Sequence, residues 1–300
     1  MSCKFRIPQD SGKVLWEITN QCNYACKYCI FSSNYKKDLK ELTTKECIKV
    51  IDQLADRNFK YIKVTGGEPF LRKDILELLT YMCKKNMNVD VSTNASVLTD
   101  RMIDELNKIN LDMIHVSVDG KDSYTHEMVR GKDTYLRTMK GLEKISKLNT
   151  HKRVGTVIHK FNEFELEEIV KLCIEYKVNE IIFSIMEPVG RMEGDNSFYK
   201  TRSIKELTIE LEKLSKEYKE IRVTYNWKKQ ANLEKVCPAL TRFIYINNLG
   251  NISPCSWVNG KYTSTISLKD NSLEDILKCR EILEFKNICD RCNYEQCNKK

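Results

Sequence analysis

The sequence has no run of apolar residues that approaches the length of a membrane-spanning helix, and its first residues lack the apolar core of a signal peptide. These absences exclude a membrane-embedded protein and predict a cytoplasmic one. Internal repeats and low-complexity tracts are also missing, so the chain is expected to fold as an ordinary globular protein. Its 300 residues suit one large domain, or one domain with a small appendage.

Histidine is scarce: the four histidines show no spacing typical of metal ligands, and we assign them no role. The formal net charge is +8, but the lysines are spread along the chain without a dense basic tail or a basic stretch with interleaved aromatics. Cysteines that bind metal as thiolates would reduce this positive charge further. A nucleic-acid partner is therefore not expected.

Cysteine is abundant, with 13 residues. Because the cytosol keeps thiols reduced, metal binding explains this number better than a disulfide framework. Cys22, Cys26 and Cys29 share one short loop after the apolar run 14–18. Structural zinc needs four closed ligands, and the next cysteine is Cys47; a disulfide would leave one thiol over. A four-iron cluster held by these three thiolates keeps one iron open to another ligand.

Apolar segments of strand and helix type alternate along the first two thirds of the chain. Strands are predicted over 13–19, 61–64, 87–93, 112–118, 153–159 and 179–186. Helices are predicted over 48–54 with a cap at Thr43 or Thr44, and over 73–85, 99–108, 133–147, 162–176 and 204–219. This alternation indicates parallel β/α units, which a right-handed crossover would curl into a partial (β/α)6 barrel of the TIM type.

Each unusual short motif follows a predicted strand, at the end where sites form in such folds. Gly66-Gly67-Glu68-Pro69 follows the second strand, Ser92-Thr93-Asn94 the third, Ser117-Val118-Asp119-Gly120 the fourth and the stretch Glu187 to Arg191 the sixth. The two glycines and the carboxylate of the first motif suit a ligand with a charged amine, because glycine lets backbone carbonyls approach closely. An ordinary turn is the alternative explanation.

The pattern changes after about residue 220. A hairpin is predicted from 243–246 through a turn at 247–250 into Ile252, followed by a helix over 273–285. Further cysteines occupy this part, at Cys237, Cys255, Cys289, Cys292 and Cys297. The other five, which lie mostly among apolar residues on predicted helices and are expected to fill the core, are Cys3, Cys47, Cys83, Cys173 and Cys279.

The Cys22, Cys26 and Cys29 spacing resembles the CxxxCxxC signature of radical S-adenosylmethionine (SAM) enzymes. That resemblance implies that the open iron of a [4Fe-4S] cluster binds SAM. It implies that Gly66, Gly67 and Glu68 bind the methionine part of SAM, that Ser117 and Arg130 bind its carboxylate, and that Tyr28 contacts its adenine. Arginine suits a carboxylate because its planar fork donates two hydrogen bonds.

The later cysteines resemble the C-terminal extensions called SPASM or twitch domains. Cys237, Cys255, Cys289 and Cys292 would close all four irons of a second, auxiliary [4Fe-4S] cluster, with Cys297 as a spare or alternate ligand. A zinc ribbon on the same cysteines is the alternative. The resemblance implies a radical SAM barrel over 1–220 and a shortened, twitch-like domain over 221–300.

The resemblance implies an enzyme that cleaves SAM reductively to a 5'-deoxyadenosyl radical and abstracts a hydrogen atom from its substrate. A ribosomally made peptide is the expected substrate, altered by crosslinking, epimerisation or oxidation. The alternative is a small-molecule dehydrogenase acting on an aminocyclitol, sugar or nucleoside. An external one-electron donor of flavodoxin or ferredoxin type is implied in either case. Outside this class, a non-catalytic iron-sulfur carrier or a zinc-binding protein stays open.

Overall fold

Parallel strands flanked by helices make up a computed structural model of the protein, which describes residues 12–34, 40–187, 189–227, 239–240, 243–258, 260 and 262–288. The chain divides into two compact units. The first comprises Met1–Cys22, Tyr35–Val91 and Asn232–Lys300, and the second comprises Asn23–Asn34 and Ser92–Ala231. Each unit combines segments that are separate in the sequence. The division therefore does not test the predicted domain boundary between residues 220 and 221, which stays a prediction.

The first unit contains a sheet in which parallel strands from both ends of the chain are neighbours. Its strands are β1 (Gly12–Thr19), β2 (Phe59–Gly66), β3 (Asn88–Thr93), β8 (Phe243–Ile246) and β9 (Ile252–Ser253). β1 pairs in parallel with β2 on one side and with β8 on the other, and β2 pairs in parallel with β3. β8 and β9 form the antiparallel hairpin that the sequence predicts.

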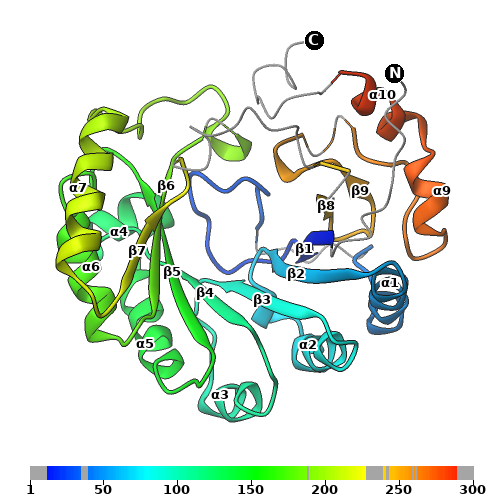
Figure 1. The fold of residues 1–300 in the computed structure, drawn as a ribbon, viewed down its shortest axis with the longest axis horizontal. Helices are drawn as coiled ribbons and strands as arrows, with labels where there is room; N and C mark the ends of the chain where they lie inside the picture. The colour runs from blue at the N-terminus through cyan, green and yellow to red at the C-terminus, as the bar shows by residue number, and fades with distance from the viewer. Residues whose placement is uncertain are drawn as a thin grey trace. The chain divides into compact units, whose positions relative to one another are not determined.

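Helices α1 (Thr44–Asp56) and α2 (Ile75–Lys84) lie beside β2 and β3 in this unit (Figure 1). α1 begins where the sequence predicts, because Thr43 accepts a hydrogen bond from the Glu46 backbone while the Glu46 carboxylate accepts one from the Thr43 backbone. Apolar side chains at helical spacing then face the sheet. The fully buried core here includes Trp16, Ile51, Leu54, Ile62, Leu78 and Leu79.

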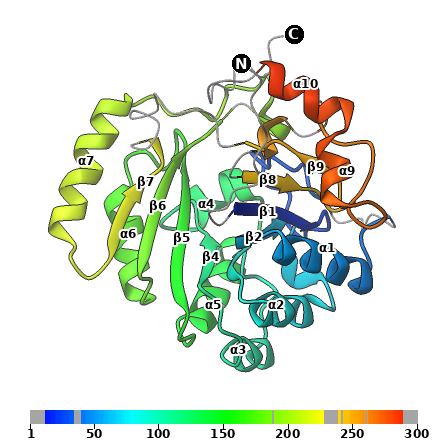
Figure 2. The same cartoon turned by 45° about the vertical axis from the view of Figure 1, so that its right-hand side comes forward.

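The second unit is built from parallel β/α repeats. Its strands are β4 (Met113–Ser117), β5 (His151–Ile158), β6 (Glu180–Ile185) and β7 (Arg222–Tyr225), each paired in parallel with the next. Its helices are α3 (Asp100–Leu106), α4 (Ser123–Arg130), α5 (Tyr135–Ile145), α6 (Leu166–Glu175) and α7 (Ile204–Glu217). Figure 2 shows β4 to β7 side by side, with α6 and α7 next to β6 and β7. The predicted core-facing leucines of α7 are buried, as are Phe183 of β6 and Val170 of α6.

Three elements differ from the sequence prediction. α4 is an additional helix that was not predicted. It has only eight residues, which are too few to show a clear apolar periodicity. β7 is an additional strand of four residues beyond α7. The predicted helix 273–285 is wrong as one element: α9 (Leu273–Leu277) ends at Lys278, and α10 (Arg280–Ile288) begins after Cys279. Cys279 is half-buried in this break, whereas Cys47 and Cys173 are buried as predicted.

Among the described residues, no helix is both long enough and apolar enough to cross a membrane.

A buried carboxyl–phenol pair joins β1 to β8. Tyr245 of β8 is fully buried and donates its hydroxyl hydrogen bond to Glu17 of β1, which also accepts one from Asn20 at 3.1 Å. Burial raises the pKa of Glu17 to about 7; these two hydrogen bonds act against the shift, and the nearby Glu41 carboxylate adds to it. The carboxyl group of Glu17 is therefore close to half-protonated at neutral pH.

This shift predicts a pH dependence of stability that Glu17→Gln removes. Because the folded state holds the proton more tightly, the contribution of Glu17 is fully present below its ordinary pKa of 4.5 and is lost as the pH rises through about 7. Wild-type protein should lose roughly 3 kcal/mol relative to E17Q across that range. Anaerobic urea unfolding at several pH values measures the difference; parallel curves for the two proteins would show that folding does not raise the pKa of Glu17.

Candidate active site

Gly66, Gly67 and Glu68 lie against the chain segment that leads into Cys22. The Gly67 backbone donates to Thr19 O at 2.7 Å and the Glu68 backbone donates to Gln21 O at 2.8 Å. A Cβ on Gly66 would lie 2.2 Å from Thr19 O, and one on Gly67 would lie 2.1 Å from Gln21 O. Gly66 also adopts a φ of +135°. The two glycines are therefore required by this close backbone approach.

Glu68 is fully buried and begins the 3-10 helix Pro69–Leu71, where its carboxylate accepts a hydrogen bond from the Phe70 backbone at 3.1 Å. This bond fixes the carboxylate beside the Gly-Gly turn. The sequence motif is thus a rigid corner attached to residues 19–21.

The start of the cysteine loop is held by polar side chains of the second unit. Asn94, directly after β3, donates to Asn23 Oδ1 at 3.0 Å, and Asn23 donates to Ser96 Oγ at 2.8 Å. The buried hydroxyl of Tyr24 donates to Thr134 O at 3.0 Å. Asn94, the last residue of the motif Ser92-Thr93-Asn94, therefore holds Asn23 at the start of the cysteine loop.

Arg191 holds the other side of the cysteine loop. Its Nη1 donates to Cys26 O at 2.9 Å, its Nη2 donates to Ser33 O, and its backbone donates to Cys29 O at 3.2 Å. The preceding Gly190 has a φ of +62°, and a Cβ there would lie 2.3 Å from Cys29 O. The sequence drew attention to the stretch after the sixth strand without assigning Arg191 this role.

Asp119 and Arg130 are buried and form an ionic cluster with the half-buried Tyr28 of the cysteine loop. Asp119 Oδ2 accepts hydrogen bonds from Arg130 Nε at 2.5 Å and from the Tyr28 hydroxyl, and its Oδ1 accepts one from the Val157 backbone at 2.8 Å. Arg130 Nη2 also donates to the Tyr28 hydroxyl. Arg130 Nη1 lies 3.9 Å from Cys26 Sγ. One buried carboxylate thus orients both the Arg130 guanidinium beside Cys26 and the Tyr28 hydroxyl within the cysteine loop.

The backbone of Asp119 is fixed as firmly as its side chain. Its N–H donates to His126 Nδ1 at 3.2 Å, and its carbonyl accepts from Asn162 Nδ2 at 3.0 Å and from His159 Nε2 at 3.2 Å. Burial and, to a smaller extent, the Arg130 charge lower the pKa of His126 to about 3. Burial also lowers the pKa of His159. Both imidazoles are therefore neutral, which suits His126 Nδ1 as an acceptor and His159 Nε2 as a donor.

Charge pairing decides the ionisation of the cluster. Burial alone would raise the pKa of Asp119, but the Arg130 guanidinium, together with the Tyr28 hydrogen bond and smaller contributions from other neighbours, holds that pKa below its usual range. For Cys26 the balance is the reverse: burial raises the pKa of the thiol, and Arg130 only moderates the rise. A cation 3.9 Å from Cys26 Sγ nevertheless favours the thiolate that iron requires. The donor set around the loop therefore fits a thiolate-bound metal cluster.

The other predicted site residues are placed in part. Cys22 is buried, Cys26 and Cys29 are half-buried thiols, and Ser117 is half-buried at the end of β4. Cys255 is half-buried between β9 and the 3-10 helix Ser256–Val258. Among the described residues no three Cys, His, Asp or Glu side chains are close enough to bind a single metal ion. The remaining predicted ligands, Cys237, Cys289, Cys292 and Cys297, lie outside the described residues.

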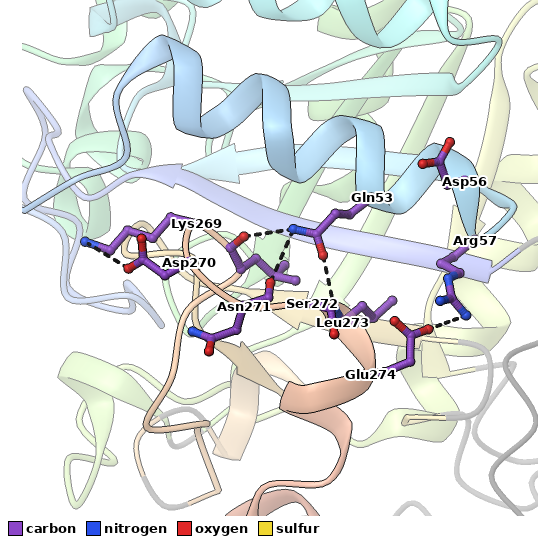
Figure 3. Close-up of a pocket in the computed structure, with 10 residues that line it drawn as sticks. Gln53, Asp56, Arg57, Lys269, Asp270, Asn271, Ser272, Leu273 and Glu274 are labelled. Atoms are coloured by element: carbon purple, nitrogen blue, oxygen red, sulfur yellow. Dashed lines mark hydrogen bonds and ion pairs between the residues drawn. The ribbon is translucent and has the colours of Figure 1, made fainter.

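A pocket of about 400 Å³ in the first unit is structural rather than part of this site (Figure 3). It lies between α1 and residues 268–274, and its polar groups bond to one another. Gln53 donates to Leu268 O at 2.9 Å and accepts from the Leu273 backbone at 3.0 Å, and Arg57 pairs with Glu274. These contacts attach the C-terminal segment to α1.

Parallel β/α units and a three-cysteine loop held beside a buried arginine define an iron-sulfur enzyme of the partial-barrel class. Residues 16–173, more than half of the chain, match the radical SAM superfamily, and the protein belongs to this family. Enzymes of this family use a [4Fe-4S] cluster and SAM. The predicted fold class and the predicted enzyme class are both confirmed.

Relatives with different activities resemble the chain. The AdoMet-dependent heme synthase of Methanosarcina barkeri (strain Fusaro / DSM 804) is 26% identical over 94% of this chain and 88% of its own length. The mycofactocin maturase MftC of Mycolicibacterium smegmatis is 31% identical over 59% of this chain. This chain spans less than half of that maturase, 45% of its length.

Among solved structures, Streptococcus suis SuiB bound to its precursor peptide SuiA has a TM-score of 0.78 at 17% identity, over 91% of this chain and 66% of that one. SuiB has also been solved bound to S-adenosylmethionine. At this level of identity the likeness establishes the fold.

The Asp119–Arg130 pair predicts a large effect of Asp119→Asn on stability. The substitution leaves a guanidinium that is 7% exposed without its carboxylate, which should cost roughly 3–5 kcal/mol. Urea unfolding measures the loss, with Asp104→Asn on the exposed face of α3 as the control. The double variant Asp119→Asn/Arg130→Gln should cost less than the sum of its parts, because it also removes the buried charge; strict additivity would contradict the pairing.

Proposed function

We propose that the protein cleaves SAM reductively and abstracts a hydrogen atom from a ribosomally made peptide, which it crosslinks, epimerises or oxidises. The observation that carries this proposal is the cysteine loop held between Arg191 and the Asp119–Arg130–Tyr28 cluster, in a chain of the radical SAM family. The similarity to a mycofactocin maturase and the fold shared with peptide-bound SuiB support a peptide as the substrate class.

When bound, the [4Fe-4S] cluster and SAM supply hydrogen-atom abstraction through a 5'-deoxyadenosyl radical. In this proposal Cys22, Cys26 and Cys29 hold the cluster. Arg191 holds the backbone carbonyls of Cys26 and Cys29 in place. Such preorganised supporting hydrogen bonds orient metal ligands and strengthen metal binding.

The other residues of the proposed SAM site would bind different groups of SAM. Gly66, Gly67 and Glu68 would bind the methionine amine, since a buried carboxylate beside backbone carbonyls favours a cation. Ser117 and Arg130 would bind the SAM carboxylate, and Tyr28 the adenine. Arg130 is suited to this because Asp119 fixes it through Nε, while Nη1 faces the loop at Cys26. The carboxylate of SAM would therefore bind an Arg130 guanidinium that Asp119 already orients.

An auxiliary cluster completes the proposal. Its ligands would be Cys255 with Cys237, Cys289 and Cys292, and Cys297 would be the alternate ligand, in a twitch-like domain over 221–300. A fully thiolate-bound cluster can accept the electron left on the substrate or orient the substrate. We also propose a cytoplasmic location and an external one-electron donor of flavodoxin or ferredoxin type.

A small-molecule substrate is the second candidate. It is favoured by the alignment with a heme synthase, which extends over nearly the whole chain rather than over the barrel part alone. The two candidates differ in which compound loses a hydrogen atom to the 5'-deoxyadenosyl group.

The iron content tests the two proposed clusters. After anaerobic reconstitution, two four-iron clusters predict about eight irons per chain, and Cys22→Ala/Cys26→Ala/Cys29→Ala should retain about four. Iron and sulfide analysis measures both proteins. A wild type with about four irons and a triple variant with almost none would contradict the auxiliary cluster, because the C-terminal cysteines would then bind zinc or no metal.

Isotope transfer tests the substrate class. A short peptide encoded beside the gene, synthesised with deuterium at its carbon positions, should pass one deuterium into 5'-deoxyadenosine, which mass spectrometry detects. The triple cysteine variant is the control and should form no 5'-deoxyadenosine. Transfer from a deuterated porphyrin or aminocyclitol, with none from the peptide, would contradict the peptide proposal and support the second candidate.

A further inference from the structure

Two exposed lysines stand over one phenylalanine beside the cysteine loop. Lys27 Nζ lies 4.2 Å from the ring centroid of Phe198, and Lys160 Nζ lies 5.7 Å from the same centroid. Lys160 Nζ also lies 5.0 Å from the centroid of Phe161, whose ring is 5.8 Å from that of Phe198. These four residues form what we call the lysine–phenylalanine patch.

The backbone under the patch is fixed. The Lys160 N–H donates to Phe198 O at 3.1 Å, and the Lys27 N–H donates to Val129 O at 2.8 Å. The buried carboxylate of Glu163 accepts from the Thr201 backbone at 2.9 Å, which ties the segment after Phe198 to the turn after β5. The backbone positions from which the two lysines extend are therefore fixed.

The surface next to the patch also combines an exposed phenylalanine with a basic side chain. Phe164 is 70% exposed, and the Arg202 guanidinium lies 5.2 Å from its ring centroid. Arg202 is paired with Glu210 at 2.5 Å. Asp195 is an exposed acid whose carboxylate accepts from the Ser197 backbone, and both patch lysines contribute to its lowered pKa. Two lysines against one acid leave the patch positive.

The patch is also directly connected to the cysteine loop. Lys27 stands between Cys26 and Tyr28 in the chain. Phe198 and Tyr28 pack against the same small apolar cluster of Val129, Met186 and Met192. Phe198 and the cysteine loop therefore share one apolar cluster.

We propose that the lysine–phenylalanine patch is the docking surface for an acidic one-electron carrier protein that contains a flavin or an iron-sulfur cluster. This inference rests on the proposed function and names its electron-donating partner. In the step it serves, the reduced carrier is oxidised by one electron and the cluster held by the cysteine loop is reduced by one; no proton or atom is transferred.

The charge and the composition of the patch both fit such a carrier. Encounters between electron-transfer proteins use small interfaces, and opposite charges steer them together at rates that fall with ionic strength. An apolar centre with a charged rim provides contact without tight binding, which a carrier needs in order to leave after each electron. Exposed charge pairs over a few residues suffice for this, because at physiological salt the Debye length is about 8 Å and closer charges are only partly screened.

The test compares Lys27→Glu/Lys160→Glu, and Lys160→Glu alone, with the control Lys140→Glu/Lys216→Glu, which reverses two exposed lysines on α5 and α7. The probe is a purified acidic flavodoxin. At low ionic strength its affinity for the patch double variant, and its rate of cluster reduction followed by visible absorbance, should fall on the order of tenfold or more. The control should match wild type, and high salt should remove the difference. Equal affinity and equal reduction rates in all four proteins would overturn the proposal.

Dithionite separates this proposal from the proposed function. As a small reductant it needs no docking surface, so dithionite-driven SAM cleavage by Lys160→Glu should equal that of wild type. If wild type itself cleaves no SAM with dithionite, the proposed function fails, whatever the flavodoxin binding shows. If dithionite-driven cleavage is intact but the variants lose affinity for an acidic peptide instead of for flavodoxin, the patch binds substrate and the carrier proposal is wrong.

Discussion

The ion pair between Asp119 and Arg130 is the interaction on which the site depends. Both side chains are almost fully excluded from water, and a charge in that environment persists only with a partner and hydrogen bonds. Asp119 has both: Arg130 and Tyr28 on its carboxylate, and His126, His159 and Asn162 on its backbone. Because the second unit fixes Asp119 so firmly, the Arg130 charge is oriented toward Cys26 and the Tyr28 hydroxyl is held before any cofactor binds. Preorganisation of this kind lowers the ordering cost of binding.

The first unit contributes a different constraint, which acts on backbone rather than on charge. Gly66 and Gly67 allow the chain to approach Thr19 and Gln21 more closely than any side chain would permit. The C-terminal strand β8 adds to this, because Tyr245 reaches the buried Glu17 of β1. The segment that enters the cysteine loop is thus supported by β2 on one side and by β8 on the other. β2 and β8, which are distant from β1 in the sequence, therefore set the position of the cysteine loop that follows β1.

Much of the fold follows from the sequence, because periodicity and caps are local signals. The strands β1 to β6, the Thr43 cap and the buried leucines of α7 all follow the apolar pattern. The short elements α4 and β7 do not, since four to eight residues carry too little periodicity. In the site, cysteine spacing and the Gly-Gly-Glu motif are visible in one dimension. The roles of Asp119, Arg191 and the two neutral histidines are not, because each depends on a partner far away in the chain. The ligand set of an auxiliary cluster stays a prediction, since most of its cysteines lie outside the described residues.

The central claim is that the loop of Cys22, Cys26 and Cys29 holds a cluster with an open iron that binds and cleaves SAM. The most direct measurement is electron paramagnetic resonance of the dithionite-reduced, reconstituted protein with and without SAM, combined with product analysis. SAM is expected to change the signal of the cluster, and 5'-deoxyadenosine and methionine are expected to form in equal amounts. A signal that SAM leaves unchanged, with neither product formed, would contradict this claim.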